Sequence, residues 1–227
     1  MESKNLIGQS QTHLITLNDG NQLHIDVEDS FTKLQKAAEK AGFSLQIASA
    51  FRSFEKQLKI WNDKAQAIRP VLDDHSQPID ILSLTESERI RAILRFSALP
   101  GASRHHWGTD FDYYDAAAVN PDYRLQLVPD EYGETGVFGG LAAWLDENMD
   151  RFGFFRPYAS DRGGVHPERW HLSHTATATQ CAQKLSVDLI RSALSTAAIT
   201  YHSTLLNEIE ELYKKFIINI DMPKSIG

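Results

Sequence analysis

The sequence contains only one cysteine, Cys181, among its 227 residues. A single thiol cannot form an intramolecular disulfide, and it also excludes the multi-cysteine sites that hold structural zinc. A metal ion bound by this chain would therefore need histidine and carboxylate ligands. The sequence has nine histidines and 30 acidic residues, so both kinds of ligand are available.

Basic charge and long apolar runs are also scarce. The formal net charge is −7, which gives no sign of the clustered positive charge that a nucleic-acid partner requires, so we expect no such partner. No stretch approaches the run of about 18 apolar residues that would span a membrane. The first residues show neither a basic segment followed by an apolar stretch nor a small-residue cleavage site. We therefore expect a cytoplasmic protein and leave a periplasmic or cell-wall location open.

The periodicity of the apolar residues predicts both strands and helices. Alternating residues around an Asp-Gly pair indicate a β-hairpin over residues 13–27. We expect Ser30 to cap a helix that Gly42 ends, and Thr85 with Glu88 to form a capping box. The other expected elements are strands over 43–51 and from 154, helices over 54–65, 85–97, 141–152 and after 174, and loops over 68–80 and 115–140 that line a cleft. These patterns predict an α+β fold, in which helices flank a small antiparallel sheet.

The segment TDFDYYD carries the first sign of chemistry. The strand period of two places Asp110 and Asp112 on one face, and Phe111 on the other. A carboxylate among aromatic residues is costly to bury unless it is paired, hydrogen-bonded or bound to metal. His105 precedes this strand, and Gly108 allows a turn that brings the imidazole to face Asp112. One histidine and one aspartate would form half of a zinc site.

The segment HPERWHLSH supplies the other half. Catalytic zinc typically takes three protein ligands and leaves one position for water, so we expect one zinc ion held by His105, Asp112 and His171. On a regular strand, the odd spacing from Glu168 to His171 would send the two side chains to opposite faces. Pro167 indicates instead that Glu168 lies at the entrance of the strand. From there Glu168 can serve as the general base toward an attacking water.

These residues resemble the zinc D-alanyl-D-alanine carboxypeptidase family of vancomycin resistance, which is related to L,D-carboxypeptidases and to the peptidase domain of the Hedgehog fold. The similarity spans about residues 40–174. It implies a peptidase domain over 1–175, with its core at about 28–174, and a helical extension over 176–227 that packs on the core or on a partner subunit. The motifs that match are S-x-H-x-x-G-x-x-x-D at Ser103, His105, Gly108 and Asp112, E-x-W-H at Glu168, Trp170 and His171, and a Y-R-S…Q pattern that reads Phe51-Arg52-Ser53 and Gln57.

The resemblance also implies roles for residues around the metal. Arg52 would contact the substrate carbonyl or carboxylate and stabilise a developing oxyanion, and Gln57 and Ser103 would orient the substrate. A structural alternative for Arg52 is an ion pair with Glu55.

Asp110 departs from the family, because many relatives carry a small apolar residue there. It would either orient His105 through its second ring nitrogen or lie as a solvated residue at the rim.

The expected function is a zinc-dependent carboxypeptidase that removes the terminal D-alanine from peptidoglycan stem peptides, with Glu168 as base. Two enzymatic alternatives on the same site are an L,D-carboxypeptidase and a murein endopeptidase. A third alternative is a non-catalytic zinc-binding module, against which the presence of Glu168 argues. The C-terminal helices could mediate an oligomer.

Overall fold

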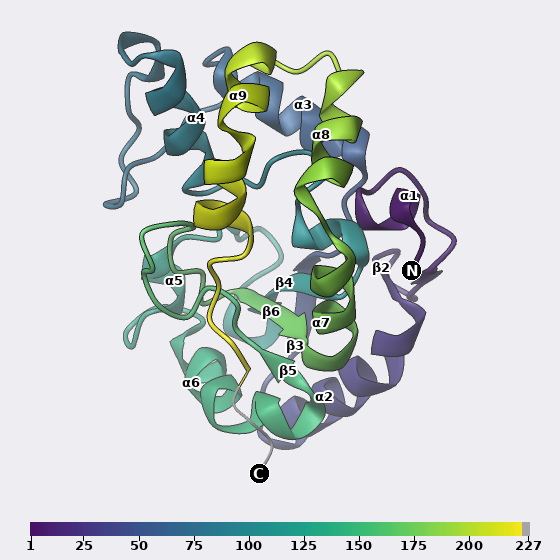
Figure 1. Cartoon of the computed structure of the whole chain (residues 1–227). Helices are drawn as coiled ribbons and strands as arrows, with labels where there is room; N and C mark the ends of the chain where they lie inside the picture. Colours follow the sequence, from purple (N-terminus) through teal and green to yellow (C-terminus); the bar gives the residue numbers. More distant parts are fainter. Residues whose placement is uncertain (224–227) are drawn as a thin grey trace.

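Helices surround two small antiparallel sheets in the computed structural model, which describes residues 1–223 (Figure 1). The hairpin consists of β1 (Leu14–Thr16) and β2 (Gln22–His24), as predicted. The larger sheet has the strand order β3-β4-β6-β5. Its strands are β3 (Leu45–Ser49), β4 (Asp110–Asp115), β6 (His171–His174) and β5 (Phe154–Phe155). The predicted α+β class with a small antiparallel sheet is confirmed.

The helices gather at the two ends of the larger sheet (Figure 1). Helices α3, α4, α8 and α9 lie at one end, and α2 and α6 lie at the other. Their bounds are α1 (Ser3–Leu6), α2 (Glu28–Lys40), α3 (Phe54–Ala65), α4 (Glu86–Leu94), α5 (Pro129–Tyr132), α6 (Gly139–Asn148), α7 (Thr175–Lys184), α8 (Val187–Ser195) and α9 (His202–Leu212). A short π-helix, Tyr213–Ile217, follows α9.

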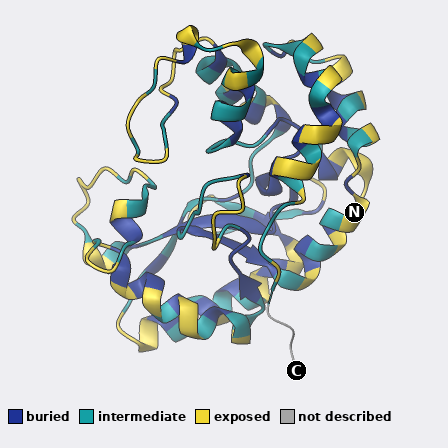
Figure 2. Ribbon diagram, turned by 60° about the vertical axis from the view of Figure 1, so that its left-hand side comes forward, coloured by how far each residue is buried: buried dark blue, intermediate teal, exposed yellow. Residues whose placement is uncertain are grey.

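Two apolar cores lie on either side of the metal-binding region. Phe111 and Tyr113, on one face of β4, pack in a core with residues of α2 and α6. Trp107 belongs to a second core, which contains residues of α3, α4, α7, α8 and α9. Strands β4, β5 and β6 of the larger sheet are almost entirely buried (Figure 2). The other face of β4, which carries Asp110 and Asp112, therefore lies buried at the boundary between the two cores.

Two predicted helix ends are wrong. Ser30 does not cap α2, because a 3-10 turn (Ile25–Val27), capped by the His24 side chain, leads directly into a helix that begins at Glu28. The Ser30 hydroxyl instead lies 3.2 Å from His174 Nε2. Helix α4 begins with the predicted capping box but ends at Leu94, three residues before the predicted end at Ser97.

Among the described residues, no helix combines the length and the apolar character needed to cross a bilayer.

Candidate metal centre and active site

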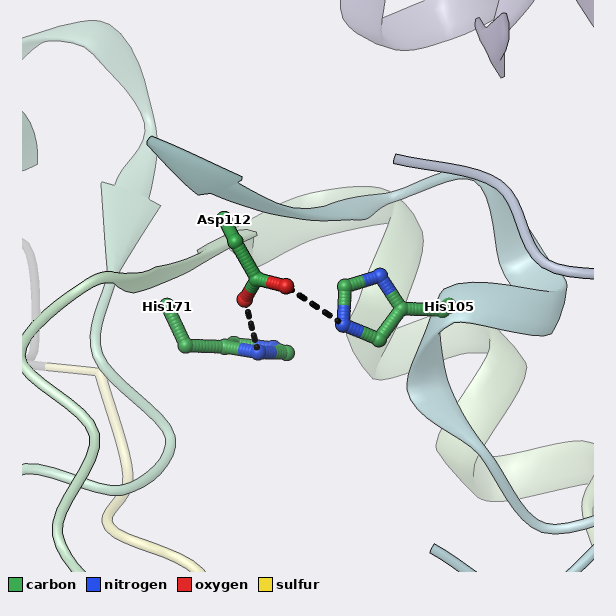
Figure 3. A group of neighbouring side chains, drawn as sticks. All are labelled: His105, Asp112 and His171. Carbon is green, nitrogen blue, oxygen red and sulfur yellow. Dashed lines mark ion pairs between the residues drawn. The ribbon is translucent and has the colours of Figure 1, made fainter. Parts of the chain in front are cut away.

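Three side chains predicted as metal ligands converge at the boundary between the cores (Figure 3). Asp112 on β4 pairs in register with His171, the first residue of β6. His105 comes from the 3-10 turn Arg104–Trp107 that precedes β4. His171 Nδ1 lies 3.2 Å from one carboxylate oxygen of Asp112, and His105 Nε2 lies 3.5 Å from the other. One ligand atom from each residue falls within 4.8 Å of the other two.

Gly108 permits the turn that brings His105 to the strand. Its φ of 65° lies in the left-handed region, where other residues are strained. A Cβ atom at this position would lie 2.5 Å from the Leu14 side chain and 2.8 Å from the His24 backbone nitrogen. The close approach accompanies a 2.8 Å hydrogen bond from that nitrogen to the Gly108 carbonyl. The β1–β2 hairpin therefore packs directly against the turn that carries His105.

Each histidine is held by a contact to its second ring nitrogen. His105 Nδ1 lies 2.8 Å from the Ala50 carbonyl, an acceptor, so Nδ1 donates and Nε2 presents a lone pair to the site. His171 Nε2 lies 3.0 Å from Asp110, which leaves Nδ1 to face Asp112. Such contacts select the tautomer and orientation that a metal ligand needs.

Asp110 is a correction to the sequence-based interpretation. It orients His171 and not His105, and it is fully buried, so it is not a solvated rim residue. Its carboxylate also accepts hydrogen bonds from Arg104 Nε at 2.7 Å and from the Thr109 hydroxyl at 2.6 Å. Burial opposes ionisation of Asp110, but Arg104 and the contact with His171 keep its pKa well below the usual range. A buried ionised carboxylate thus orients His171, one of the predicted metal ligands.

The donor atoms fit a zinc ion. Within residues 1–223, His171 Nδ1 and one oxygen of Asp112 are buried without a hydrogen-bond partner. Buried polar atoms are normally satisfied, and a cation between these atoms would satisfy both. Two imidazole nitrogens and one carboxylate form the ligand set of a catalytic zinc site with an open position.

The electrostatics of the three residues favour a bound cation. Burial lowers the pKa of His105 to about 3, against the pull of Asp112, so this imidazole is neutral. Burial also acts to lower the pKa of His171, but the neighbouring carboxylates of Asp110 and Asp112 outweigh it and raise the pKa to about 9. The two carboxylates therefore attract positive charge to His171, either a proton or a metal ion.

Glu168 lies just before β6, at the predicted strand entrance. Its backbone nitrogen donates to the Tyr158 carbonyl at 2.9 Å, and its carbonyl accepts from the His171 nitrogen at 3.1 Å. This turn places the Glu168 carboxylate 3.6 Å from His171 Nδ1, on the same side as the ligands. Burial, assisted by Asp112 and opposed by His171, raises the pKa of Glu168 to about 7.

Arg52 enters the same site from the segment before α3. Its guanidinium donates to Gln57 Oε1 at 2.9 Å and to the Ser49 hydroxyl at 3.3 Å. The alternative ion pair with Glu55 is absent from the described part of the chain. Gln57 is fully buried behind Arg52, and its amide nitrogen donates to the Ala98 carbonyl at 2.6 Å.

Ser103 lies near His105 in the sequence, and it lines a cavity that the three predicted ligands also line. Its buried hydroxyl has no hydrogen-bond partner within residues 1–223.

The comparison with known proteins assigns the family. The model of the VanY D-alanyl-D-alanine carboxypeptidase family matches residues 20–177, more than half of the chain. The chain belongs to this family. The resemblance stated from the motifs is confirmed, and the matched range contains every predicted site residue.

Relatives of the VanY type extend the comparison. A D-alanyl-D-alanine carboxypeptidase of Enterococcus faecalis is 27% identical over 169 residues, 73% of this chain and 53% of the relative. The match thus spans about half the length of that relative. An uncharacterised protein of Haemophilus influenzae is 31% identical over 122 residues, 53% of this chain and 93% of the relative.

Solved structures of VanY proteins share the fold. VanYB in complex with D-alanine-D-alanine has a TM-score of 0.55 and 24% identity, with 83% of this chain and 91% of that chain covered. A vancomycin-resistance D,D-pentapeptidase VanY variant in complex with Zn(II) has a TM-score of 0.53 and 25% identity, with 80% and 92% covered.

Residues outside the motifs complete the site. A cavity of about 380 Å³ is lined by the predicted site residues other than Gln57 and by both predicted cleft loops. Its wall also includes Lys64, Tyr158 and the C-terminal residues Phe216 and Ile217, none of which was predicted as a site residue. Lys64 follows Gln57 by about two helical turns, a spacing that could have revealed it. Phe216 and Ile217 lie beyond the VanY family match, and their apolar pattern is that of any packed helix.

Proposed function

We propose that this VanY-family chain is a zinc-dependent carboxypeptidase that removes the terminal D-alanine from peptidoglycan stem peptides. The observation that carries the proposal is the convergence of His105, Asp112 and His171, with unpartnered buried donor atoms, beside the carboxylate of Glu168. The known complexes of VanY proteins with D-alanine-D-alanine and with Zn(II) support the substrate and the metal.

The roles of the residues follow from their positions. Zinc held by the three ligands would activate a water molecule and polarise the scissile carbonyl. Glu168 takes a proton from the attacking water and returns it to the amine that leaves when the peptide bond breaks. Asp110 keeps the His171 ring in its ligating orientation through the reaction.

Arg52 and Ser103 would hold the substrate. Gln57 and Ser49 fix the guanidinium of Arg52, so its remaining N–H groups can bind the terminal carboxylate or the developing oxyanion. In this arrangement Gln57 orients the substrate through Arg52. The unpartnered Ser103 hydroxyl is available for a hydrogen bond to the peptide.

A panel of defined peptides tests the reaction. We expect the zinc-loaded chain to release D-alanine from Ac-Lys-D-Ala-D-Ala, faster than it cleaves Ac-Lys-D-Ala or a cross-linked muropeptide. Preference for Ac-Lys-D-Ala would favour the L,D-carboxypeptidase alternative, and preference for the cross-linked muropeptide would favour the endopeptidase. If none of these peptides is cleaved, the proposed function fails.

The isosteric variant Glu168→Gln tests the assigned base. We expect kcat to fall at least about a hundredfold, because the amide cannot accept the proton, while one equivalent of zinc remains bound. A variant with zinc and the parent rate would overturn the role of Glu168.

A further inference from the structure

Lys64, in the last turn of α3, is a half-buried cation in the wall of the catalytic cavity. Its ammonium donates to the Ser97 hydroxyl at 2.7 Å, and within residues 1–223 it forms no ion pair. The nearby carboxylate of Asp63 is engaged by Lys59 at 2.8 Å and by Arg69 at 3.6 Å. Desolvation of a cation without a partner anion is unfavourable, so this position needs an explanation.

The cavity is lined by charges of both signs. Asp112 and Glu168 are its acidic residues near the predicted metal site, whereas Lys64 and Arg69 come from α3 and the loop after it, and Arg52 precedes α3. Burial lowers the pKa of Lys64 to about 8; Glu168 opposes this shift, and the cations Arg69 and Arg52 add to it. The α3 side therefore attracts anions.

Helix α3 holds both Arg52 and Lys64 in the cavity wall. Gln57, which holds Arg52, and Lys64 lie about two turns apart on one face of the helix. Both are bonded to the same segment, Gln57 to the Ala98 carbonyl and Lys64 to the Ser97 hydroxyl. In a peptide that ends in D-Ala-D-Ala, the first residue that can carry a side-chain carboxylate is the third from the C-terminus.

We propose that Lys64 is a specificity-determining residue, which binds a carboxylate on the third residue from the C-terminus of the peptide substrate. The inference rests on the proposed function, because it places the terminal carboxylate at Arg52. The substrate class is then a stem peptide that ends in D-Ala-D-Ala and carries a side-chain carboxylate immediately before these two residues.

A structural role for Lys64 makes a different prediction. A lysine in the last turn of a helix interacts favourably with the helix dipole. Its loss would then lower stability without changing the choice between substrates. The ratio of rates for an acidic and a neutral substrate separates the two roles.

The test uses the zinc-loaded chain and the peptides Ac-X-D-Ala-D-Ala, in which X is glutamate, glutamine or lysine. We expect kcat/KM to be about tenfold higher for glutamate than for glutamine, and lowest for lysine. Lys64→Gln should bring the glutamate-to-glutamine ratio close to one, and Lys64→Arg should keep most of it. Lys59→Gln, an exposed position on the same helix, is the matched control and should keep the parent ratio.

Binding of the same peptides to the zinc-loaded Glu168→Gln variant separates the two proposals. Suppose that the parent chain cleaves no peptide, but that the glutamate peptide binds more tightly than the glutamine peptide only when Lys64 is present. The carboxylate site is then supported and the proposed reaction is not. If the glutamate and glutamine peptides bind and react equally, or if Lys64→Gln affects both to the same extent, the carboxylate site is overturned.

Discussion

The two sides of the catalytic cavity are built in different ways. On the sheet side, Asp112 and His171 face each other because β4 and β6 pair in that register, and their donor atoms lie 3.2 Å apart. On the helical side, Lys64 depends on the position of α3, and Phe216 depends on the packing of the C-terminal helices. The sheet side is thus determined by short motifs, and the helical side by contacts between segments distant in the sequence.

The largest effect is expected from a ligand on the sheet side. His171→Ala leaves only two ligands, so we expect loss of tightly bound zinc and a fall in kcat/KM of at least about a thousandfold. Zinc content after dialysis and the rate of D-alanine release measure both. His174→Gln is the control on the same strand. Because His174 contacts Ser30 and Thr177, this variant should retain zinc. A His171→Ala variant with one equivalent of zinc and the parent rate would rule out this ligand.

The sheet side was predictable from the sequence because strand alternation and Pro167 are local signals. They placed Asp112 on the site face and Glu168 at the strand entrance. The partner of Asp110 was not predictable, because the second nitrogen of His105 is occupied by the Ala50 carbonyl. A backbone acceptor that follows a separate strand leaves no mark in the sequence.

The helical side was predicted only as secondary structure. The apolar spacing indicated helices after residue 174, and α7, α8 and α9 confirm it. It could not indicate that the C-terminal segment runs from this helical end past the sheet (Figure 1). That path depends on tertiary contacts such as the 2.9 Å hydrogen bond from the Asn219 side-chain nitrogen to the Arg162 carbonyl. The division of the chain at residue 175 remains a prediction.

Gly108 tests how tightly the sheet side is built. Gly108→Ala combines a positive φ with contacts of 2.5 and 2.8 Å, so we expect about 3 kcal/mol of destabilisation. Gly163→Ala is the matched control, since Gly163 has a φ of 74° and open space around a Cβ, and it should cost about 1 kcal/mol. Urea unfolding of both variants measures the difference. Equal losses would show that the hairpin yields easily at the His105 turn.

Asp221 links the C-terminal segment to residues 157–160, and its loss should have the smallest effect. Its carboxylate accepts hydrogen bonds from the Ser160 nitrogen at 2.8 Å and hydroxyl at 2.7 Å, and its nitrogen donates to the Pro157 carbonyl at 2.9 Å. These contacts hold the segment that carries Tyr158, whose ring centroid lies 5.2 Å from that of His171.

We expect Asp221→Ala to raise KM for Ac-Lys-D-Ala-D-Ala about threefold to fivefold and to change kcat less, because the cleft wall loosens while the metal ligands remain in place. Ser160→Ala should give a similar but smaller effect. The double variant should add little, because both changes remove the hydrogen bond between the Ser160 hydroxyl and Asp221. Asp188→Ala, an exposed position on α8, should leave both constants unchanged. An unchanged KM in Asp221→Ala would mean that the C-terminal segment lines the cavity without positioning the substrate.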